Sequence, residues 1–68
     1  NNDLLIEASA SNIIESSINL LNMIHRTYDQ DNASELERRF INSIKSGDPR
    51  KFKRSINRII ESKKNDNT

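Results

Sequence analysis

The sequence predicts an all-α fold, a small three-helix domain with a long first helix that assembles into a helical oligomer. The chain shows no alternating strand pattern, its helix start and stop signals divide it into three segments, and the first segment carries more apolar surface than the others can cover. We expect one interaction domain over residues 1–64, with helices over residues 4–28, 33–46 and 49–62, and a polar tail at 65–68.

The first helix is expected to begin near Asp3, whose carboxylate can cap it, and to end around Tyr28. Its apolar residues spread over roughly 160° of the helix, which is broader than one neighbouring helix can cover. They are Ile6, Ala10, Ile13, Ile14, Ile18, Leu20, Leu21, Ile24 and Tyr28. This helix therefore needs more than one partner.

The second helix follows a polar run over residues 29–32, and either Asn32 or Ser34 is expected to cap its start. Glu35 and Glu37 then lie early in the helix, where the helix dipole favours negative charge. One apolar stripe is expected to face the core. It consists of Leu36, Phe40, Ile41 and Ile44.

The strongest local signal lies between the second and third helices. Gly47, the one glycine of the chain, follows a basic last turn, as a left-handed C-terminal cap does. Asp48 can cap the third helix, and Pro49 suits its first position. So short a turn favours an antiparallel hairpin. The third helix is expected to turn Phe52, Ile56, Ile59 and Ile60 inward.

The apolar face of the first helix can be divided between a core and a partner. We expect Ile13, Leu20 and Ile24 to face the internal core. The predicted partner surface consists of Ile14, Ser17, Ile18, Leu21 and Tyr28. Ser17 allows close helix approach, or it is simply tolerated there. Alternatively, the second and third helices flank the first and hide its whole apolar face, although residues 4–14 would still extend past them.

The size of the chain supports association. Domains of 68 residues usually need disulfides, a metal or oligomerisation, and this chain has no cysteine and a single histidine. His25 lies at the edge of the apolar face, and Glu35 and Glu37 point to different sides of their helix. We therefore predict no catalytic residue, no enzyme activity, no cofactor, no metal site and no small-molecule substrate.

The charge is unevenly distributed. Residues 50–64 hold seven basic residues and one acid, whereas residues 1–49 hold four basic and eight acidic residues. Arg50, Lys51, Arg54 and Arg58 form a basic stripe on the third helix. This stripe can be a solvated face, a contact for an acidic protein or a second copy, or a nucleic-acid contact; the last makes a nucleic-acid-binding module the alternative function.

No signal peptide or run of about 20 apolar residues is present, so we expect no membrane partner and an intracellular location. A start at Asn1 suggests a segment of a longer protein.

Two resemblances bear on function. Residues 34–41 (SELERRFI) and 52–60 (FKRSINRII) resemble the last two helices of the paramyxovirus phosphoprotein X domain, which binds a helical segment of the nucleoprotein tail. The first helix here is much longer. The composition and residues 12–21 (NIIESSINLL) resemble the C-terminal domain of the budding-yeast Rap-one-interacting telomere factor. That second resemblance implies an oligomerisation module of a nuclear protein associated with telomeres and chromatin.

Overall fold

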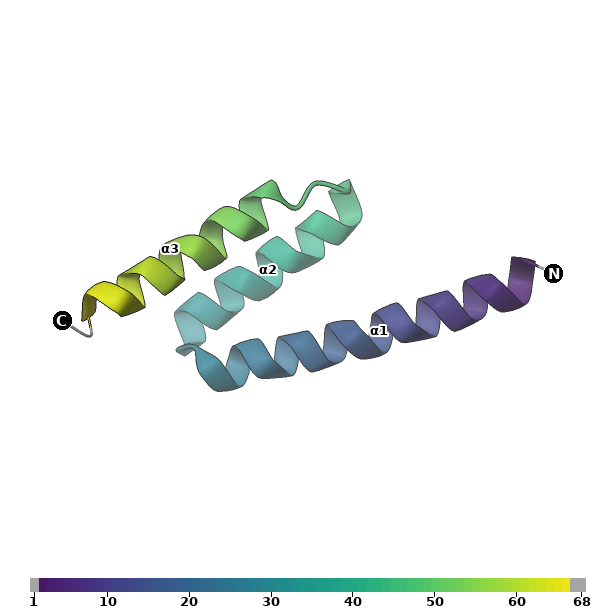
Figure 1. The fold of residues 1–68 in the computed structure, drawn as a ribbon, viewed down its shortest axis with the longest axis horizontal. Helices are drawn as coiled ribbons and strands as arrows, with labels where there is room; N and C mark the ends of the chain where they lie inside the picture. Colours follow the sequence, from purple (N-terminus) through teal and green to yellow (C-terminus); the bar gives the residue numbers. More distant parts are fainter. Residues whose placement is uncertain (1, 67–68) are drawn as a thin grey trace.

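The computed structural model describes residues 2–66, which form three helices and no strand (Figure 1). Helix α1 spans Asn2–Thr27, α2 spans Gln30–Ser46 and α3 spans Arg50–Asp66. The all-α class and the long first helix are therefore confirmed. None of the three helices is long and apolar enough to cross a membrane.

The start of α2 differs from the sequence prediction. Asp29 is the N-cap residue, with an extended backbone at φ −65° and ψ 165°, so the predicted caps Asn32 and Ser34 are wrong. The Asp29 carbonyl accepts a hydrogen bond from the Ala33 N–H at 2.8 Å, and its carboxylate accepts one from the Asn32 amide at 2.7 Å. Ala33 is fully buried in the first turn of α2.

The end of α3 also differs. The helix continues to Asp66, four residues beyond the predicted end at Ser62, so Asn65 and Asp66 of the expected tail are helical. The tail positions 67 and 68 lie outside the described residues.

The turn between α2 and α3 has the predicted chemistry. Gly47 adopts the left-handed conformation with φ 77°, and its N–H donates to the Ser43 carbonyl at 2.8 Å. The Asp48 carboxylate accepts a hydrogen bond from the Arg50 N–H at 3.1 Å, which caps the start of α3. The glycine cap is confirmed, and the Asp48 side chain binds an N–H of the first turn as predicted. Pro49 lies one position before the predicted one, because α3 begins at Arg50 and the Pro49 carbonyl accepts the bond from the Lys53 N–H at 3.0 Å.

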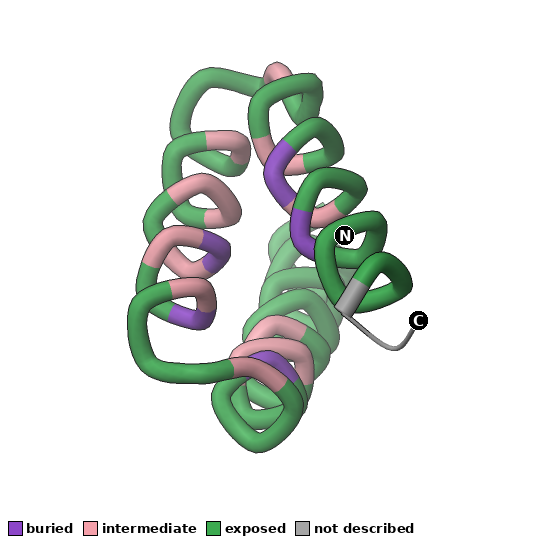
Figure 2. Tube along the Cα trace, turned by 90° about the vertical axis from the view of Figure 1, so that its left-hand side faces the viewer, coloured by how far each residue is buried: buried purple, intermediate pink, exposed green. Residues whose placement is uncertain are grey.

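The core lies where the C-terminal part of α1 meets α2 and α3. Its buried side chains are Ile24, Ala33, Leu36 and Ile59, and the partly buried residues around them are Leu20, Leu21, Tyr28, Phe52 and Ile56. Phe40 and Phe52 close the far end of the α2–α3 hairpin with an edge-to-face ring contact at 6.0 Å. Figure 2 shows the buried positions turned toward the space between the helices.

The arrangement in space leaves much of α1 uncovered. Helices α2 and α3 form an antiparallel hairpin. The C-terminal end of α1 lies beside the start of α2, and the two helices diverge with distance from this connection (Figure 1). The molecule is therefore elongated, with extents of 55 × 22 × 17 Å. Residues 2–16 of α1, called the arm below, are all exposed.

Candidate interaction surface

The arm carries an apolar face that nothing in the described chain covers. Ile6 is 66% exposed and Ile13 is 59% exposed, although both are large aliphatic residues. Large apolar side chains scattered singly on a surface are ordinary, but a contiguous apolar face marks an interaction site. A shallow hollow of about 490 Å³ runs along this face. Its lining residues are Asn2, Leu5, Ile6, Ser9, Ala10 and Ile13.

A second hollow lies in the angle between α1 and α2. We call it the groove. It measures about 320 Å³, and its lining contains no charged residue. Helix α1 contributes Asn12, Ile13, Ser16, Ser17 and Leu20, and helix α2 contributes Phe40 and Ile44. Ile44, which the sequence placed in the core stripe, is 65% exposed because α1 has already diverged from α2 at this level.

The structure divides the predicted partner surface. Ile14 and Ile18 are exposed, and Ser17 is half-buried in the lining of the groove. Leu21 and Tyr28 instead pack against the core, where the Lys63 ammonium lies 4.9 Å from the centre of the Tyr28 ring. Leu21 and Tyr28 are therefore half-buried against the core and do not lie on a free surface as predicted.

The core assignments need one correction. Leu20 and Ile24 pack in or against the core as predicted, whereas Ile13 does not. The same divergence that exposes Ile44 leaves Ile13 without a neighbour from α2. The alternative in which both shorter helices hide the whole apolar face of α1 is also wrong.

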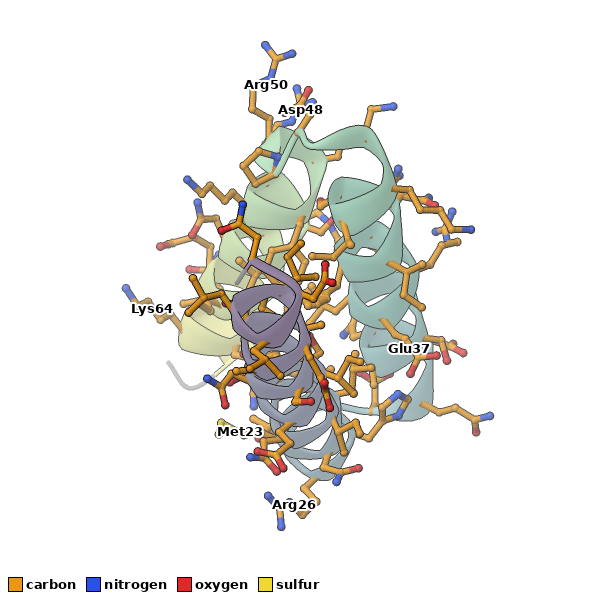
Figure 3. All side chains as sticks on the ribbon, turned by 90° about the vertical axis from the view of Figure 1, so that its right-hand side faces the viewer. Met23, Arg26, Glu37, Asp48, Arg50 and Lys64 are labelled. Carbon is orange, nitrogen blue, oxygen red and sulfur yellow. The ribbon has the colours of Figure 1, made fainter. Side chains whose placement is uncertain are left out.

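The predicted basic stripe is partly neutralised within the chain. The Arg50 guanidinium binds the Asp48 carboxylate with both Nε and Nη2, and this contact holds the pKa of Asp48 below its usual value. Figure 3 shows these two side chains together at the end of the hairpin. Arg58 donates to Glu35 at 2.5 Å and, with the Ser55 hydroxyl, lowers the pKa of that carboxyl.

The other two residues of the basic stripe lie beside a third cation from α2. Lys51 and Arg54 of α3 line a small hollow of about 230 Å³ together with Arg39 of α2 and Ser55. The Arg39 Nε is buried and has no hydrogen-bond partner among the described residues. The sequence stripe did not include Arg39, because only the hairpin brings it beside α3.

The single histidine of the chain pairs with a carboxylate on the surface. His25 lies 2.8 Å from Glu37, and these two side chains tie the outer surface of α1 to α2. Residues 2–66 hold no group of three or more histidine and acidic side chains suited to a metal ion. The described residues form two candidate interaction surfaces, an apolar one along α1 and a basic one across the α2–α3 hairpin.

Comparison with protein families, with curated protein sequences and with solved structures gave no significant match. The chemistry of the two surfaces therefore carries the functional argument.

Several residues of the candidate surface were missed by the sequence reasoning. The omitted residues are Leu5, Ile6 and Ala10 of the arm and Phe40 and Ile44 of the groove. One signal pointed to them. The predicted first helix was much longer than either of the others, so its N-terminal half had to project beyond their cover.

Proposed function

We propose that this domain is a protein–protein interaction module that homo-oligomerises through the arm and the groove. The observation that carries the proposal is the uncovered apolar face of the arm, which continues the face that builds the core. Burial of each side chain such as Ile6 or Ile13 contributes about 1 to 2 kcal/mol, given their present exposure. A second copy supplies the same apolar surface.

The test is sedimentation equilibrium across a range of concentrations, with two matched variants. Ile6→Asp places a charge on the apolar face and should weaken association about 100-fold. Ala8→Asp adds the same charge two residues away, on the opposite side of the helix, and should leave association intact. A wild-type chain that remains monomeric at high micromolar concentration contradicts the proposal, and so does equal disruption by the two variants.

The role we propose for such a module is to give a larger parent protein several linked binding surfaces. Linked copies gain avidity without any new contact, because the second binding event becomes intramolecular. The resemblance of residues 12–21 to a telomere-factor domain supports a nuclear, chromatin-associated parent. Imaging of the tagged full-length protein tests this location, and exclusion from the nucleus contradicts it.

A second candidate function is nucleic-acid binding, which the cluster of Arg39, Lys51 and Arg54 favours. These three cations converge around one hollow, whereas Arg50 and Arg58 are engaged with Asp48 and Glu35. Phosphates are the natural partners of such a cluster, and each phosphate contact adds salt dependence. An acidic protein segment is the other partner that this charge suits.

The test compares two arginine variants in DNA-binding titrations at several salt concentrations. Arg54→Ala should weaken binding and reduce the salt slope by about one, because it removes one phosphate contact. Arg50→Ala is the matched control and should have a smaller effect, because Asp48 already neutralises Arg50. Absence of binding to duplex and single-stranded DNA at low salt excludes nucleic acid as the partner.

A further inference from the structure

The arm and the groove meet at one residue. Ile13 lines both the hollow along the arm and the groove between α1 and α2. At 100° per residue, part of the lining of both hollows falls with Ile13 on one strip of α1 about 80° wide. The arm hollow contributes Ile6 and Ala10 to this strip, and the groove contributes Ser17 and Leu20. A projecting apolar helix and an apolar receptacle thus lie on either side of Ile13.

We propose a geometry for the dimer, which rests on the self-association proposed above. Two copies pair through antiparallel α1 helices, and the arm of each copy occupies the groove of the other. The two-fold axis passes near Ile13. A two-fold interface brings the same patch of both copies together, so it must be self-complementary. The chain meets this condition because the arm and the groove flank one point on α1.

The proposed register fits the sizes of the facing side chains. With Ile13 opposite its own copy, Ile6 lies opposite Leu20 of the second copy, and Ser9 lies opposite Ser17 of the second copy. Small residues at the second of these levels allow the helices to approach within the usual 8 to 10 Å. The larger pair lies beside Phe40 and Ile44, which form the far wall of the groove.

Charge also favours the antiparallel arrangement. The arm carries Asp3, Glu7 and Glu15, and no basic residue precedes Arg26. In the proposed register Asp3 and Glu7, which flank the strip, lie at the level of the uncharged Met23 and Asn19 of the second copy. A parallel pair in register would place each of these two acids at the level of its own copy, and it would leave both grooves empty. Antiparallel helix dipoles add a further favourable contribution.

The area is sufficient for a specific dimer. The contact covers Leu5, Ile6, Ile13 and Ile44 of each copy, which are 59–66% exposed in the single chain. At about 100 Å² for each of these side chains, and with about 57% of a typical interface apolar, the two copies bury about 1,400 Å² in total. Specific interfaces bury about 1,200 to 2,000 Å².

A mixing experiment tests the exchange of arms. Ile6→Asp disables the arm and Ile44→Asp disables the groove, so each variant alone should dimerise about 100-fold more weakly than wild type. In an equimolar mixture, the arm of the Ile44→Asp copy meets the intact groove of the Ile6→Asp copy. Association should therefore recover by about tenfold. Asn42→Asp, which adds a charge to α2 outside the groove, is the control and should bind as wild type does.

Spin labels provide a second readout that distinguishes two kinds of failure. Single-cysteine variants Leu4→Cys, Ser11→Cys and Asn22→Cys lie on the outward side of α1, and the chain has no other cysteine. Antiparallel pairing separates like labels along the helix axis by about 27, 6 and 27 Å respectively, whereas parallel pairing in register gives the same spacing at all three sites. Equal spacings, or a dimer that Ile44→Asp does not weaken, overturn the proposed geometry and leave self-association standing. A monomer at all concentrations overturns both.

Discussion

The two halves of α1 are both rich in large aliphatic residues but have opposite surroundings. Residues 17–27 supply Ile24 to the core and place Leu20 and Leu21 against it, whereas every residue of the arm is exposed. Both halves continue the same apolar strip. The difference therefore comes from the angle at which α2 leaves α1 and from the shorter length of α2. In this chain, whether an apolar residue is buried depends more on the presence of a neighbouring helix than on the residue itself.

The largest expected effect comes from the covered region. Leu36→Ala removes a fully buried side chain of α2, and we expect it to reduce the free energy of unfolding by about 2 to 5 kcal/mol. Urea denaturation at low protein concentration measures this loss. Leu5→Ala in the arm is the matched control and should change the same quantity by less than about 0.5 kcal/mol. Similar losses in both variants would show that the arm is packed in solution, and the comparison would fail.

A smaller effect is expected at the turn that holds the covering hairpin together. Gly47→Ala should cost about 1 kcal/mol, because a residue with a Cβ is disfavoured at φ 77°. No atom lies within 4 Å of the added Cβ, so the cost arises from the backbone alone. Thermal unfolding followed by circular dichroism measures it. A stability equal to or above that of wild type would contradict the left-handed conformation of Gly47.

The ion pair between α2 and α3 gives a pH dependence to the covered region. Arg58 and Ser55 lower the folded-state pKa of Glu35 below its ordinary value of 4.5. The stabilisation is therefore complete above about pH 4.5 and is lost as the pH falls through the lower folded-state value. Because Arg58 is largely exposed, the contribution is less than about 1 kcal/mol. The difference in stability between wild type and Glu35→Gln should shrink as acid is added, and a constant difference would contradict this assignment.

The smallest effect on folding is expected in the arm itself. At concentrations where the chain is monomeric, Ile6→Asp should change the unfolding free energy by less than about 0.5 kcal/mol, because Ile6 contacts no core residue. The same variant should abolish the concentration dependence of the melting temperature, which is the signature of association. Melting curves over a dilution series measure both quantities. A destabilised monomer would show that the arm packs against its own chain.

The parts of the fold that local chemistry determines were predictable from the sequence. Gly47 and Asp48 cap their helices through backbone conformation and short-range hydrogen bonds, and both signals are local. The amphipathic stripe likewise identified Leu36 and Ile59 as inward-facing residues. Asp29 was missed as a cap because the four consecutive polar residues 29–32 offer several helix starts, and the local sequence does not select among them.

The candidate surface was predictable only in part, because it depends on the crossing of distant segments. The excess of apolar residues in α1 indicated that some of its face would be exposed. Which residues are exposed depends on the point at which α1 diverges from α2. Ile13, predicted in the core, is exposed, whereas Leu21 and Tyr28, predicted on the partner surface, pack against the core. No periodicity in a single segment encodes that angle, and the same limitation hid the approach of Arg39 to Lys51 and Arg54.

Because α1 is long and joined to α2 by a short connection, a small change of angle at the connection moves the N-terminal end of α1 a long way. Only Tyr28 and Asp29 separate the two helices, and the contacts of Tyr28 with the core and with Lys63 fix the direction in which α1 leaves the hairpin. With 26 residues, α1 is about 39 Å long, so a rotation of about 10° at this connection displaces its free tip by about 7 Å. Substitutions at Tyr28 or Lys63, which lie far from the arm, can therefore change the distance between the hairpins of an assembled complex while its contact residues stay unchanged.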